Sequence, residues 1–517
     1  MTADRLADAF RSVVFNSEIK NIRTTFFELQ FKKMWSFFRV GKVSIKEIRK
    51  LDSEISDNAN APARNPLKRK GGHLMKLLST KQFYEQYEAL FGQTVTVSGW
   101  VKTKRLGKEV GFVEIGDGTC MQSIQVVVDL KKELETGFGL GACLLVTGTL
   151  VLTPEAKQPF EVQAEEITVM GDSEADYPLQ KKRHSNEYLR TIPHLRPRTN
   201  LFSAVFRVRS VLTHAILEFL YKEGFTYVQS PCMTSCDGEG AGEVFRLKTE
   251  EFFGKETCLT VTGQLHVEPF AQALRRVYTF GPSFRAEDSN TPRHVAEFWQ
   301  VEPEMAFCDL EELMDTIEAM CKYIIRAVLT ESREELEFFD RFVEQGLIEK
   351  LEQVVATDFA RVSYKDAVKL LMESGEQFQI PASMETPIQT EHERYLAGEV
   401  FKRPVFVTDY PKGQKAFYMY QNDDGETVAA TDLLFPKLGE IVGASQREHR
   451  LEKLQKRIEE CGLREEDYAW YCDLRRYGSC VHSGFGLGVE RMMRYITGME
   501  NIRDVIAYPR TPGTILF

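Results

Sequence analysis

The hydrophobic pattern of this chain changes once, and that change limits the folds open to it. Residues 94–169 contain five short β-branched runs, several of them separated by Gly or Asp-Gly, which is the pattern of short strands joined by tight turns. From residue 200 on, apolar residues recur at helical spacing and alternate with longer strand-like runs. A chain of 517 residues is also too long for a single core. We therefore expect an α+β protein in which a small all-β domain precedes a larger mixed domain.

Two polar segments set the expected domain boundaries. Residues 51–72 hold two prolines and end in Gly-Gly, which is typical of a linker. Residues 176–198 hold three prolines and six basic against two acidic residues, and their lack of periodicity predicts a hinge. The expected parts are an N-terminal extension with its linker at 1–80, a β-domain at 81–175, a hinge at 176–199 and a mixed domain at 200–517.

The N-terminal extension is basic, whereas the rest of the chain is acidic. Residues 1–80 hold 16 Lys and Arg against 8 Asp and Glu, a balance of +8. Because the whole chain carries −10, the remainder carries −18. A basic arm on an acidic body is typical of a protein that binds a polyanion at selected points. Composition does not identify that polyanion as RNA.

Several features predict a protein of the reducing cytoplasm. No run of 18 apolar residues occurs, so we expect no membrane span. The first 30 residues include Asp4, Asp8, Glu18 and Glu28, which argues against a secretory signal or a transit peptide. The ten cysteines form no CxxC pair, and the closest two lack a second pair at zinc-ligand spacing. Free thiols are therefore expected rather than a zinc site or disulfides.

The β-domain has the features of a small Greek-key barrel. Five short strands in about 75 residues suggest a barrel of the OB-fold type, which commonly binds oligonucleotides. The strand pattern by itself fits a β-domain without a ligand equally well. Both interpretations stay open at this point.

The segment FRAEDSNTPRHVAEFWQVEPE predicts two strands that flank a polar loop. Arg285 and Arg293 offer guanidinium groups that can bind phosphate in a bidentate manner, and Phe298 can stack on a flat base. Each of these residues alone is more often a surface arginine or a core aromatic. The spacing of these residues taken together with Glu287 and His294 is a far more specific sign of a binding site than any one of them alone.

A second segment, GFGLGVERMMRYITG at 484–498, predicts a glycine-rich turn directly before a helix. Glycines allow the backbone to approach a ligand closely, and Arg491, next to Glu490 in the first helical turn, would project there. The string has no Lys-Ser/Thr, and no GxGxxG follows a βαβ pattern. A Walker A loop and a dinucleotide fingerprint are therefore excluded.

These strings resemble the three signature motifs of the class II aminoacyl-tRNA synthetases, in the right order. The motifs are FRVRS…YVQSP, FRAE…RHVAEF and GFGLGVER, and the preceding barrel resembles that of the aspartyl, asparaginyl and lysyl subgroup. EGAGEVF, TVTGQLHVE and GEIVGASQREHR are similar to the asparaginyl-tRNA synthetases in particular. The resemblance runs from about residue 95 to the C-terminus.

The resemblance implies a catalytic domain with an antiparallel sheet flanked by helices, preceded by an OB-fold that reads the anticodon. It implies ATP, L-asparagine and tRNA(Asn) as substrates and Mg²⁺ as the cofactor. The expected reaction forms asparaginyl-adenylate and transfers asparagine to the 3′ end of the tRNA. A homodimer is expected to form around the first motif and Pro231.

For the nucleotide site, the resemblance implies roles for the matching residues. Arg285 and Arg491 are the expected catalytic residues, the first on the α-phosphate of ATP and the second on the γ-phosphate. Phe298 would stack on adenine. Asp432 and Glu440 would hold Mg²⁺ on the phosphates, which fits the oxygen ligands that this ion requires. Further expected contacts to ATP or the tRNA acceptor end are Glu287, Arg293 and His294.

Four residues would bind the amino acid. The resemblance implies that Glu239 and Gln264 bind the ammonium group, that Arg447 binds the side-chain carbonyl, and that Glu268 reads the side-chain amide. A carboxylate at Glu268 would accept a hydrogen bond from asparagine and repel aspartate, and such a site can reject the wrong analogue by roughly 10⁴-fold. The alternative is a solvated glutamate at the end of a strand.

In the barrel, GFVEI and SIQVV match the anticodon strands of the subgroup. Phe112 would stack on the central anticodon base, Gln125 would hydrogen-bond its edge, and Arg105 would lie near the phosphates. Stacking plus edge contacts is the general way in which single-stranded RNA is read. Taken alone, a Phe in a strand is more often a core residue.

The expected chemistry needs no protein nucleophile. The amino-acid carboxylate must attack an anionic phosphorus, and pyrophosphate must leave in line. Positioning, two arginines and Mg²⁺ spread the developing charge. No catalytic Ser, Cys or His is therefore expected.

Three other interpretations are disfavoured. An aspartyl-tRNA synthetase would carry a lysine where this chain has Val267. An asparagine-forming paralogue on the same core needs neither the barrel nor the basic hinge, and a non-catalytic RNA-binding protein has no need to keep an ATP site. The departures from the family pattern are Ala444, Tyr420 and the C-terminal string, and none removes an expected catalytic group.

Overall fold

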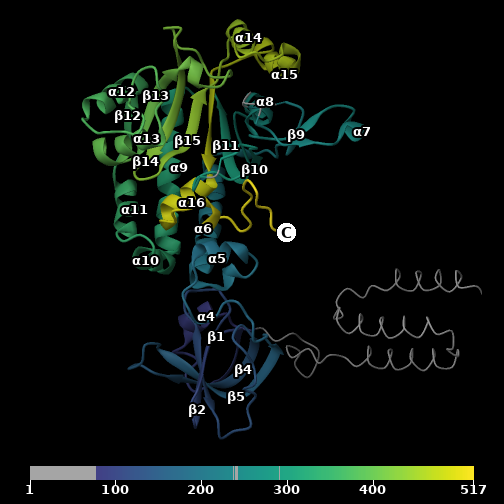
Figure 1. Cartoon of the computed structure of the whole chain (residues 1–517), viewed down its shortest axis with the longest axis vertical. Coiled ribbons are helices and arrows are strands. Elements are labelled where there is room, and N and C mark those ends of the chain that lie inside the picture. Colours follow the sequence, from purple (N-terminus) through teal and green to yellow (C-terminus); the bar gives the residue numbers. More distant parts are fainter. Residues whose placement is uncertain (1–76, 237, 239–242, 290) are drawn as a thin grey trace, which may run out of the picture. The chain divides into compact units, whose positions relative to one another are not determined.

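The computed structural model describes residues 77–236, 238, 243–289 and 291–517. The expected N-terminal extension at 1–80 lies outside these residues except for its last four, and so does Glu239. From Leu78 to Phe517 the chain forms one compact unit. This unit has one hydrophobic core inside a β-barrel and another around a large sheet, in line with the two patterns in the sequence (Figure 1).

The first part is a closed five-stranded barrel with strand order β1-β2-β3-β5-β4. Burial alternates along its strands, as in β2, where Val113 and Ile115 face the core and Phe112 faces outward. Helix α4 (Thr80–Gln86) packs Phe83 into the barrel core. The five expected strands are therefore confirmed, as β1 (Thr94–Leu106), β2 (Val110–Gly116), β3 (Ile124–Asp129), β4 (Cys143–Leu152) and β5 (Phe160–Gly171).

The second part is built on an eight-stranded sheet with order β12-β13-β14-β15-β16-β11-β10-β6. Neighbouring strands are antiparallel except in the pairs β12–β13 and β10–β6, which confirms the expected antiparallel architecture. The strands are β6 (Thr226–Tyr227), β10 (Arg276–Phe284), β11 (Glu297–Ala306), β12 (Ala360–Ser363), β13 (Val405–Pro411), β14 (Thr427–Phe435), β15 (Gly439–Gln446) and β16 (His482–Gly488). A small separate sheet pairs β7 (Met233–Thr234), β9 (Thr257–Leu259) and β8 (Arg246–Leu247).

Helices flank the large sheet (Figure 1). The two longest, α6 (Asn200–Lys222) and α9 (Leu310–Glu331), pack against each other, and α9 also contacts β15 and β16. No helix among the described residues is both long and apolar enough to cross a membrane. The other helices are α5 (Asn186–Thr191), α7 (Glu250–Phe253), α8 (Gln264–Leu274), α10 (Arg333–Phe342), α11 (Leu347–Ala356), α12 (Tyr364–Glu373), α13 (Thr390–Tyr395), α14 (Leu451–Glu460), α15 (Glu465–Arg476) and α16 (Val489–Thr497). Short 3₁₀ or π turns are η1 (Arg196–Arg198), η2 (Leu396–Val400), η3 (Lys412–Gln414) and η4 (Ile502–Asp504).

Two segments that the sequence predicts as extended are helical instead. The runs at 206–224 and 309–329 have apolar residues at helical spacing, and the helices that they predict are confirmed. The run at 258–274 predicts strand and turn, and the run that begins at 470 predicts strand, but they contain α8 and the end of α15. In α8 the buried residues Leu265, Val267 and Glu268 lie on a helix that contacts β10 and β11. Tertiary packing therefore decides the conformation of this segment.

The glycine-rich run GFGLG is a strand and not the turn that the sequence predicts. It forms most of β16, and α16 begins at Val489 directly after it. Gly484 lies opposite Glu304 of β11, and a Cβ atom at Gly484 would overlap with the Glu304 carboxylate. The glycine is needed for close packing of two strands at this point.

The segment expected to be a solvated hinge is partly structural. It contains α5 and η1, and its Arg190 binds Asp504 through two hydrogen bonds of 2.8 and 2.5 Å. Arg196 is fully buried and donates to the backbone carbonyls of Arg503 (3.1 Å), Ile506 and Ala507 (3.3 Å). Burial lowers the pKa of Arg196 to about 10. These two arginines therefore hold the segment to the C-terminal part of the chain and do not form a free basic surface.

This contact makes a test of stability possible. Replacing Asp504 with Asn should lower the free energy of unfolding by about 3 kcal/mol, because the buried guanidinium groups lose their counter-charge. Glu187→Gln is the matched control, since Glu187 pairs with the same Arg190 at 3.8 Å but is 76% exposed, and it should leave stability unchanged. Denaturant-induced unfolding measures both variants. Equal effects of the two substitutions would contradict a structural role for Asp504.

Candidate active site

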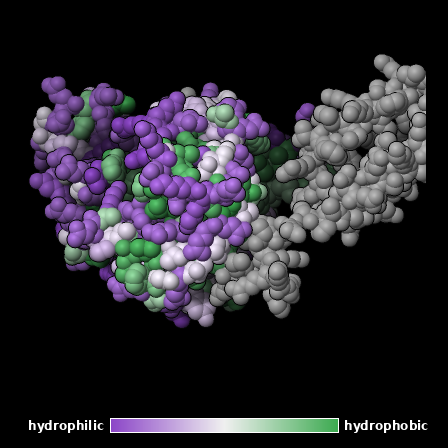
Figure 2. Space-filling view, turned by 90° about the horizontal axis from the view of Figure 1, so that it is seen from below, coloured by the Kyte–Doolittle hydropathy of each residue, from purple (hydrophilic) through white to green (hydrophobic). Residues whose placement is uncertain are grey.

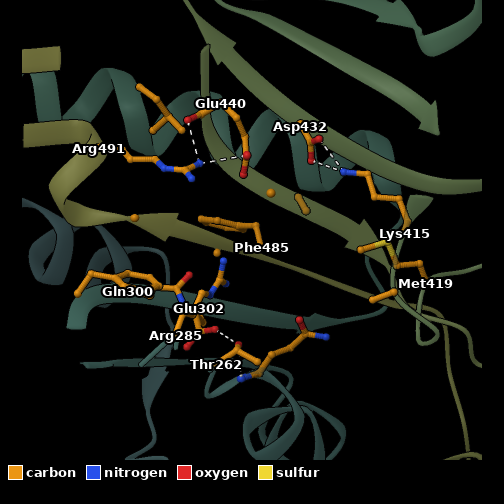
Figure 3. A pocket seen from close by; sticks show the side chains of 18 of the residues that line it. Thr262, Arg285, Gln300, Glu302, Lys415, Met419, Asp432, Glu440, Phe485 and Arg491 are labelled. Carbon is orange, nitrogen blue, oxygen red and sulfur yellow. Dashed lines mark hydrogen bonds and ion pairs between the residues drawn. The ribbon is translucent and has the colours of Figure 1, made fainter. Parts of the chain in front are cut away.

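A pocket of about 540 Å³ opens between the loop after β10, the strands β11, β14, β15 and β16, and the start of α16. Figure 3 shows that side chains from these separate elements point toward a common space. Ten residues that the sequence predicts as site residues line this pocket. They are Gln264, Arg285, Glu287, Arg293, His294, Phe298, Asp432, Glu440, Arg447 and Arg491.

One wall of the pocket comes from β10, β11 and the loop that joins them. Arg285 follows the last residue of β10, and its guanidinium lies 5.3 Å from the ring centroid of Phe298 on β11. The loop is held by His294, whose Nδ1 lies 2.7 Å from Thr291 Oγ1 and 3.0 Å from Ser289 Oγ. Burial lowers the pKa of His294. A cation and an aromatic face therefore stand together on a rigid strand pair, which suits a phosphate next to a flat base.

The opposite end of the pocket presents Arg491 and two carboxylates. Arg491 comes from the first turn of α16, and its Nη1 lies 3.1 Å from a carboxylate oxygen of Glu440 and 3.2 Å from the Glu440 carbonyl oxygen (Figure 3). Asp432 lies on β14, next to Gly443 of β15. A Cβ atom at Gly443 would lie 3.6 Å from Glu440 Oε1 and 3.8 Å from Asp432 Oδ1. Both carboxylates therefore flank one small space that a glycine leaves open.

This pair of carboxylates fits a magnesium ion that arrives with a nucleotide. Mg²⁺ is usually bound by one or two carboxylates together with substrate phosphates, and not by a complete protein cage. Among the described residues, no group of three or more His, Cys, Asp or Glu is placed to hold a metal ion. Asp432 and Glu440 therefore match the donor set of a site that phosphate oxygens complete.

The end of the pocket lined by Gln264 and Arg447 is fixed by two buried glutamates that the sequence does not predict as site residues. Glu302 accepts hydrogen bonds from Gly263 N (2.8 Å) and from Thr262 Oγ1, just before Gln264 begins α8. Glu304 binds the guanidinium of Arg447 in a bidentate manner. Burial raises the pKa of Glu304, whereas the charge of Arg447 acts in the opposite direction. The two acids lie at positions i and i+2 of β11, so the strand period aims both at the same face.

Glu268 lies one layer behind the pocket wall. It is fully buried on α8, so the alternative of a solvated strand-end glutamate is wrong. Its carboxylate accepts hydrogen bonds from Tyr471 Oη (2.6 and 2.8 Å), Arg475 Nη2 (3.1 Å) and Gln264 Nε2 (3.2 Å). Burial alone would raise the pKa of Glu268, but Arg475, His482 and Arg447 together lower it below its ordinary value.

Sequence reasoning missed the partners of Glu268 for a specific reason. Tyr471 and Arg475 lie on α15, which the sequence predicts as a strand, and His482 begins β16. His482 Nε2 lies 3.1 Å from Glu268 Oε2. More than 200 residues separate Glu268 from these partners, so no local pattern connects them. Lys415 lies only 17 residues from Asp432, but it stands on a connection between two elements, so no strand or helix periodicity places it beside that carboxylate.

The three residues predicted to read an anticodon share the outer face of the barrel. Arg105 of β1 lies directly opposite Phe112 of β2, which is 43% exposed. Gln125 of β3 lies opposite Glu114, two residues along β2 from Phe112, and therefore on the same face. Figure 2 shows the end of the molecule that carries the barrel as mainly hydrophilic, with separate hydrophobic patches. The structure thus brings Arg105, Phe112 and Gln125 together, while Glu239 lies outside the described residues.

Two family models match this chain. One, described as tRNA synthetases class II (D, K and N), covers residues 185–512. The other, described as an OB-fold nucleic acid binding domain, covers residues 95–170. The first model alone covers more than half of the chain, and the second coincides with the closed barrel.

Named relatives and solved structures agree with these models. The chain is 54% identical to an asparagine–tRNA ligase of Clostridium botulinum over 84% of this chain and 98% of that protein. It is 53% identical to the ligase of Bacillus cytotoxicus over 84% of this chain and 99% of that protein. The structure of asparaginyl-tRNA synthetase from Pyrococcus horikoshii with asparaginyl-adenylate has a TM-score of 0.78, at 34% identity over 86% of this chain and 100% of that one. The chain therefore belongs to the class II tRNA synthetases of the D, K and N type, and among these to the asparagine–tRNA ligases.

Proposed function

We propose that the pocket activates L-asparagine with ATP and that the asparaginyl group then passes to the 3′ end of tRNA(Asn). The observation that carries this proposal is the convergence of Arg285, Phe298, Arg491 and Arg447 on one space. A triphosphate needs separate cations along its length, a base needs an aromatic face, and asparagine needs a hydrogen-bond donor for its side-chain oxygen. The pocket supplies each of these from a different place in the fold: the loop after β10, strand β11, helix α16 and the residue after β15.

In the activation step, a carboxylate oxygen of asparagine attacks the α-phosphorus of ATP. The new P–O bond forms as the bond to the bridging oxygen breaks, and pyrophosphate leaves in line. Arg285 would bind the α-phosphate, Arg491 the γ-phosphate, and Phe298 the adenine, so the reacting atoms are held and the added charge is neutralised. Mg²⁺ held by Asp432 and Glu440 would supply further neutralisation of the phosphates. Glu287, Arg293 and His294 lie on the same wall and would contact the phosphates or the acceptor end of the tRNA.

Selection of asparagine over aspartate would follow from the charge balance at the amino-acid end. The guanidinium of Arg447 is already bound by Glu304, and Arg475 is bound by Glu268. An aspartate carboxylate would need a cation without a counter-charge, and these pairs leave no surplus positive charge. A neutral amide needs only unused N–H groups of Arg447 for its oxygen. Glu268 would therefore disfavour aspartate through its charge and through the hydrogen bond by which it positions Gln264.

Direct reading of the asparagine amide by Glu268, as the sequence predicts, requires a change of partners. Both carboxylate oxygens are occupied by Tyr471, and one also accepts from Arg475. Gln264 and Arg447 line the pocket between the substrate space and Glu268. One of these contacts would have to open before the amide could reach the carboxylate. With Glu239, Gln264 would bind the substrate ammonium group.

The transfer step would use the tRNA that the barrel selects. A ribose hydroxyl of the terminal adenosine attacks the adenylate carbonyl, and AMP leaves. Phe112 would stack on an anticodon base, Gln125 would bond its edge and Arg105 would meet the phosphates, which their shared outer face supports. The basic extension at 1–80 would add affinity for the tRNA through its charge.

We further propose that the protein acts as a homodimer in the cytoplasm. Tyr227 and Met233, on either side of Pro231, are 51% and 49% exposed, which supports an interface around the first signature motif. The ten cysteines of the sequence form no CxxC pair, as suits a reducing compartment. The barrel and the sheet have separate cores, which supports the division into an extension at 1–80, a barrel at 81–175, a connector at 176–199 and a catalytic domain at 200–517.

The first test concerns Arg285 and Arg491, the two arginines proposed to bind phosphate. Arg285→Ala or Arg491→Ala should each cost about 3–5 kcal/mol of transition-state stabilisation while the protein stays folded. ATP–pyrophosphate exchange with asparagine measures the loss, and Arg276→Ala, at the start of β10 and paired with Glu312 at 3.0 Å, is the matched control that should keep full activity. Near-normal exchange by a folded Arg285→Ala protein would rule out the assignment.

The second test concerns Glu268. Glu268→Gln keeps the shape of the side chain and removes its charge. The transition-state stabilisation derived from kcat/KM for asparagine should therefore fall by about 2–4 kcal/mol, and the ratio of kcat/KM for asparagine to that for aspartate should decrease. Tyr471→Phe is the control, because it removes one hydrogen bond to the same carboxylate but no charge, and it should keep the selection. Pyrophosphate exchange with both amino acids measures the ratio. A folded Glu268→Gln protein that still rejects aspartate as strongly as the parent would place selection elsewhere.

The third test concerns the strand pairing that positions Arg447. Gly484→Ala should displace the Glu304 carboxylate, because the added methyl group overlaps with it and neither group is free to move. We expect the KM for asparagine to rise about tenfold or more, while the KM for ATP changes little. Gly281→Ala on β10 is the control, since a Cβ atom there meets no atom within 4 Å. An unchanged KM for asparagine in Gly484→Ala would show that the Glu304–Arg447 pair does not set the site.

A further inference from the structure

Lys415 forms an ion pair at the position where a metal ion is expected. Its Nζ atom donates to both carboxylate oxygens of Asp432, at 2.7 and 2.6 Å (Figure 3). The same Nζ lies 3.9 Å from the ring centroid of Tyr410. The side chains of Lys415 and Asp432 are 16% and 15% exposed, so water screens this pair only weakly. An ammonium group between two carboxylate oxygens occupies the place of a chelated divalent ion.

The carboxylates around Lys415 explain why a cation is needed there before any substrate binds. Asp432 and Glu440 both lie within 4 Å of the position of a Cβ atom at Gly443. Glu393 lies next to them, and its Oε2 accepts a hydrogen bond from Glu440 N at 3.3 Å. Several carboxylates this close repel one another unless cations separate them. Arg491 provides one such cation, on Glu440, and Lys415 provides the other, on Asp432.

The two cations differ in how easily they can move. Arg491 is anchored in the first turn of α16 and also bonds the Glu440 carbonyl oxygen. Lys415 follows the short turn η3 and precedes β14, so it lies on a connection and not within a sheet strand or helix. Its ammonium is a point charge on a flexible stem, which can exchange partners without breaking a planar fork of hydrogen bonds. Lys415 lines the same pocket as Arg285, so phosphate oxygens entering that pocket come within its reach.

We propose that Lys415 holds the chelating position of Asp432 in the free enzyme, excludes free divalent cations from it, and gives way only when the metal enters together with a nucleotide. This inference rests on the proposed role of Asp432 in binding Mg²⁺. The nucleotide supplies the anionic oxygens that the displaced ammonium needs, whereas a free metal ion supplies none. Lys415 is thus a positioning residue that couples metal entry to nucleotide binding.

The test measures binding of Mn²⁺ to the full-length chain without nucleotide, by the loss of the free-ion electron paramagnetic resonance signal. Lys415→Met should bind Mn²⁺ about tenfold or more tightly than the parent, because the competing charge-assisted hydrogen bonds are gone. Lys415→Gln serves as a second neutral variant and should behave alike, and circular dichroism checks that both are folded. Lys412→Met is the matched control, since Lys412 lies on η3 and pairs with the distant Glu460 at 4.0 Å; it should match the parent.

Two further measurements separate this inference from the proposed function. Asp432→Asn in the Lys415→Met background should abolish the added Mn²⁺ binding, which locates the gain at Asp432. A non-hydrolysable ATP analogue also chelates Mn²⁺ in solution, so with the analogue present the Mn²⁺ that stays with the protein after removal of small molecules is measured; the parent should then bind Mn²⁺ as tightly as the variant. If neither neutral variant gains affinity for Mn²⁺ without nucleotide, but the parent binds Mn²⁺ with the analogue, Lys415 does not exclude the metal. The proposed metal site is then still supported. If the parent binds no Mn²⁺ even with the analogue, the proposed metal site itself is overturned.

Discussion

The carboxylate of Glu490 is the contact on which the arrangement of the pocket depends. It is 2% exposed and accepts a hydrogen bond from Arg209 Nη2 of α6 at 2.6 Å and another from Trp299 N of β11 at 3.0 Å. Glu490 itself lies in the first turn of α16, next to Arg491. One side chain therefore ties together a helix, a strand and a second helix that come from widely separated parts of the sequence. Arg491 follows Glu490 directly and lines the pocket. The contacts of Glu490 therefore fix the direction in which the Arg491 guanidinium points.

The part of the pocket proposed to bind the amino acid depends on a second set of buried charges. Burying charged groups is costly, and a buried ion pair is weak evidence for stability. Here Glu304 and Arg447 pair inside the sheet, while Glu268 and Arg475 pair directly behind it. The physical gain is a pocket floor whose hydrogen-bond donors are already oriented before substrate arrives, which lowers the cost of reorganisation during the reaction. The same pairing compensates the positive charge of the floor, and the proposed selection of a neutral amide over a carboxylate rests on that.

The residues that form the pocket wall around Arg285 and Phe298 could largely be predicted from the sequence, because they lie in contiguous strings. Arg285 and Phe298 are close in sequence, and an antiparallel strand pair with a loop places them on one wall almost automatically. The acidic partners Glu302 and Glu304 lie in the same strand but were not predicted as site residues, since a charged residue in a strand normally faces solvent. The buried contacts of the two arginines in the predicted hinge could not be predicted from the sequence either. Arg190 and Arg196 stand in a polar, proline-rich run, yet their partners lie some 300 residues away.

By itself the sequence determined the five-stranded barrel, the long helices, the family and the residues on the wall of the pocket, because each depends on local periodicity or on a contiguous motif. Only the tertiary structure decided that Glu268 lies behind the pocket wall and not at a solvated strand end, that GFGLG packs as a strand, and that Lys415 forms an ion pair with Asp432. The physical reason is the same in each case. Each feature is set by a contact that no local pattern shows, across about 180 residues or more for Glu268 and GFGLG and across 17 residues for Lys415. At these contacts, burial and the pairing of charges override the local preference of the residues involved.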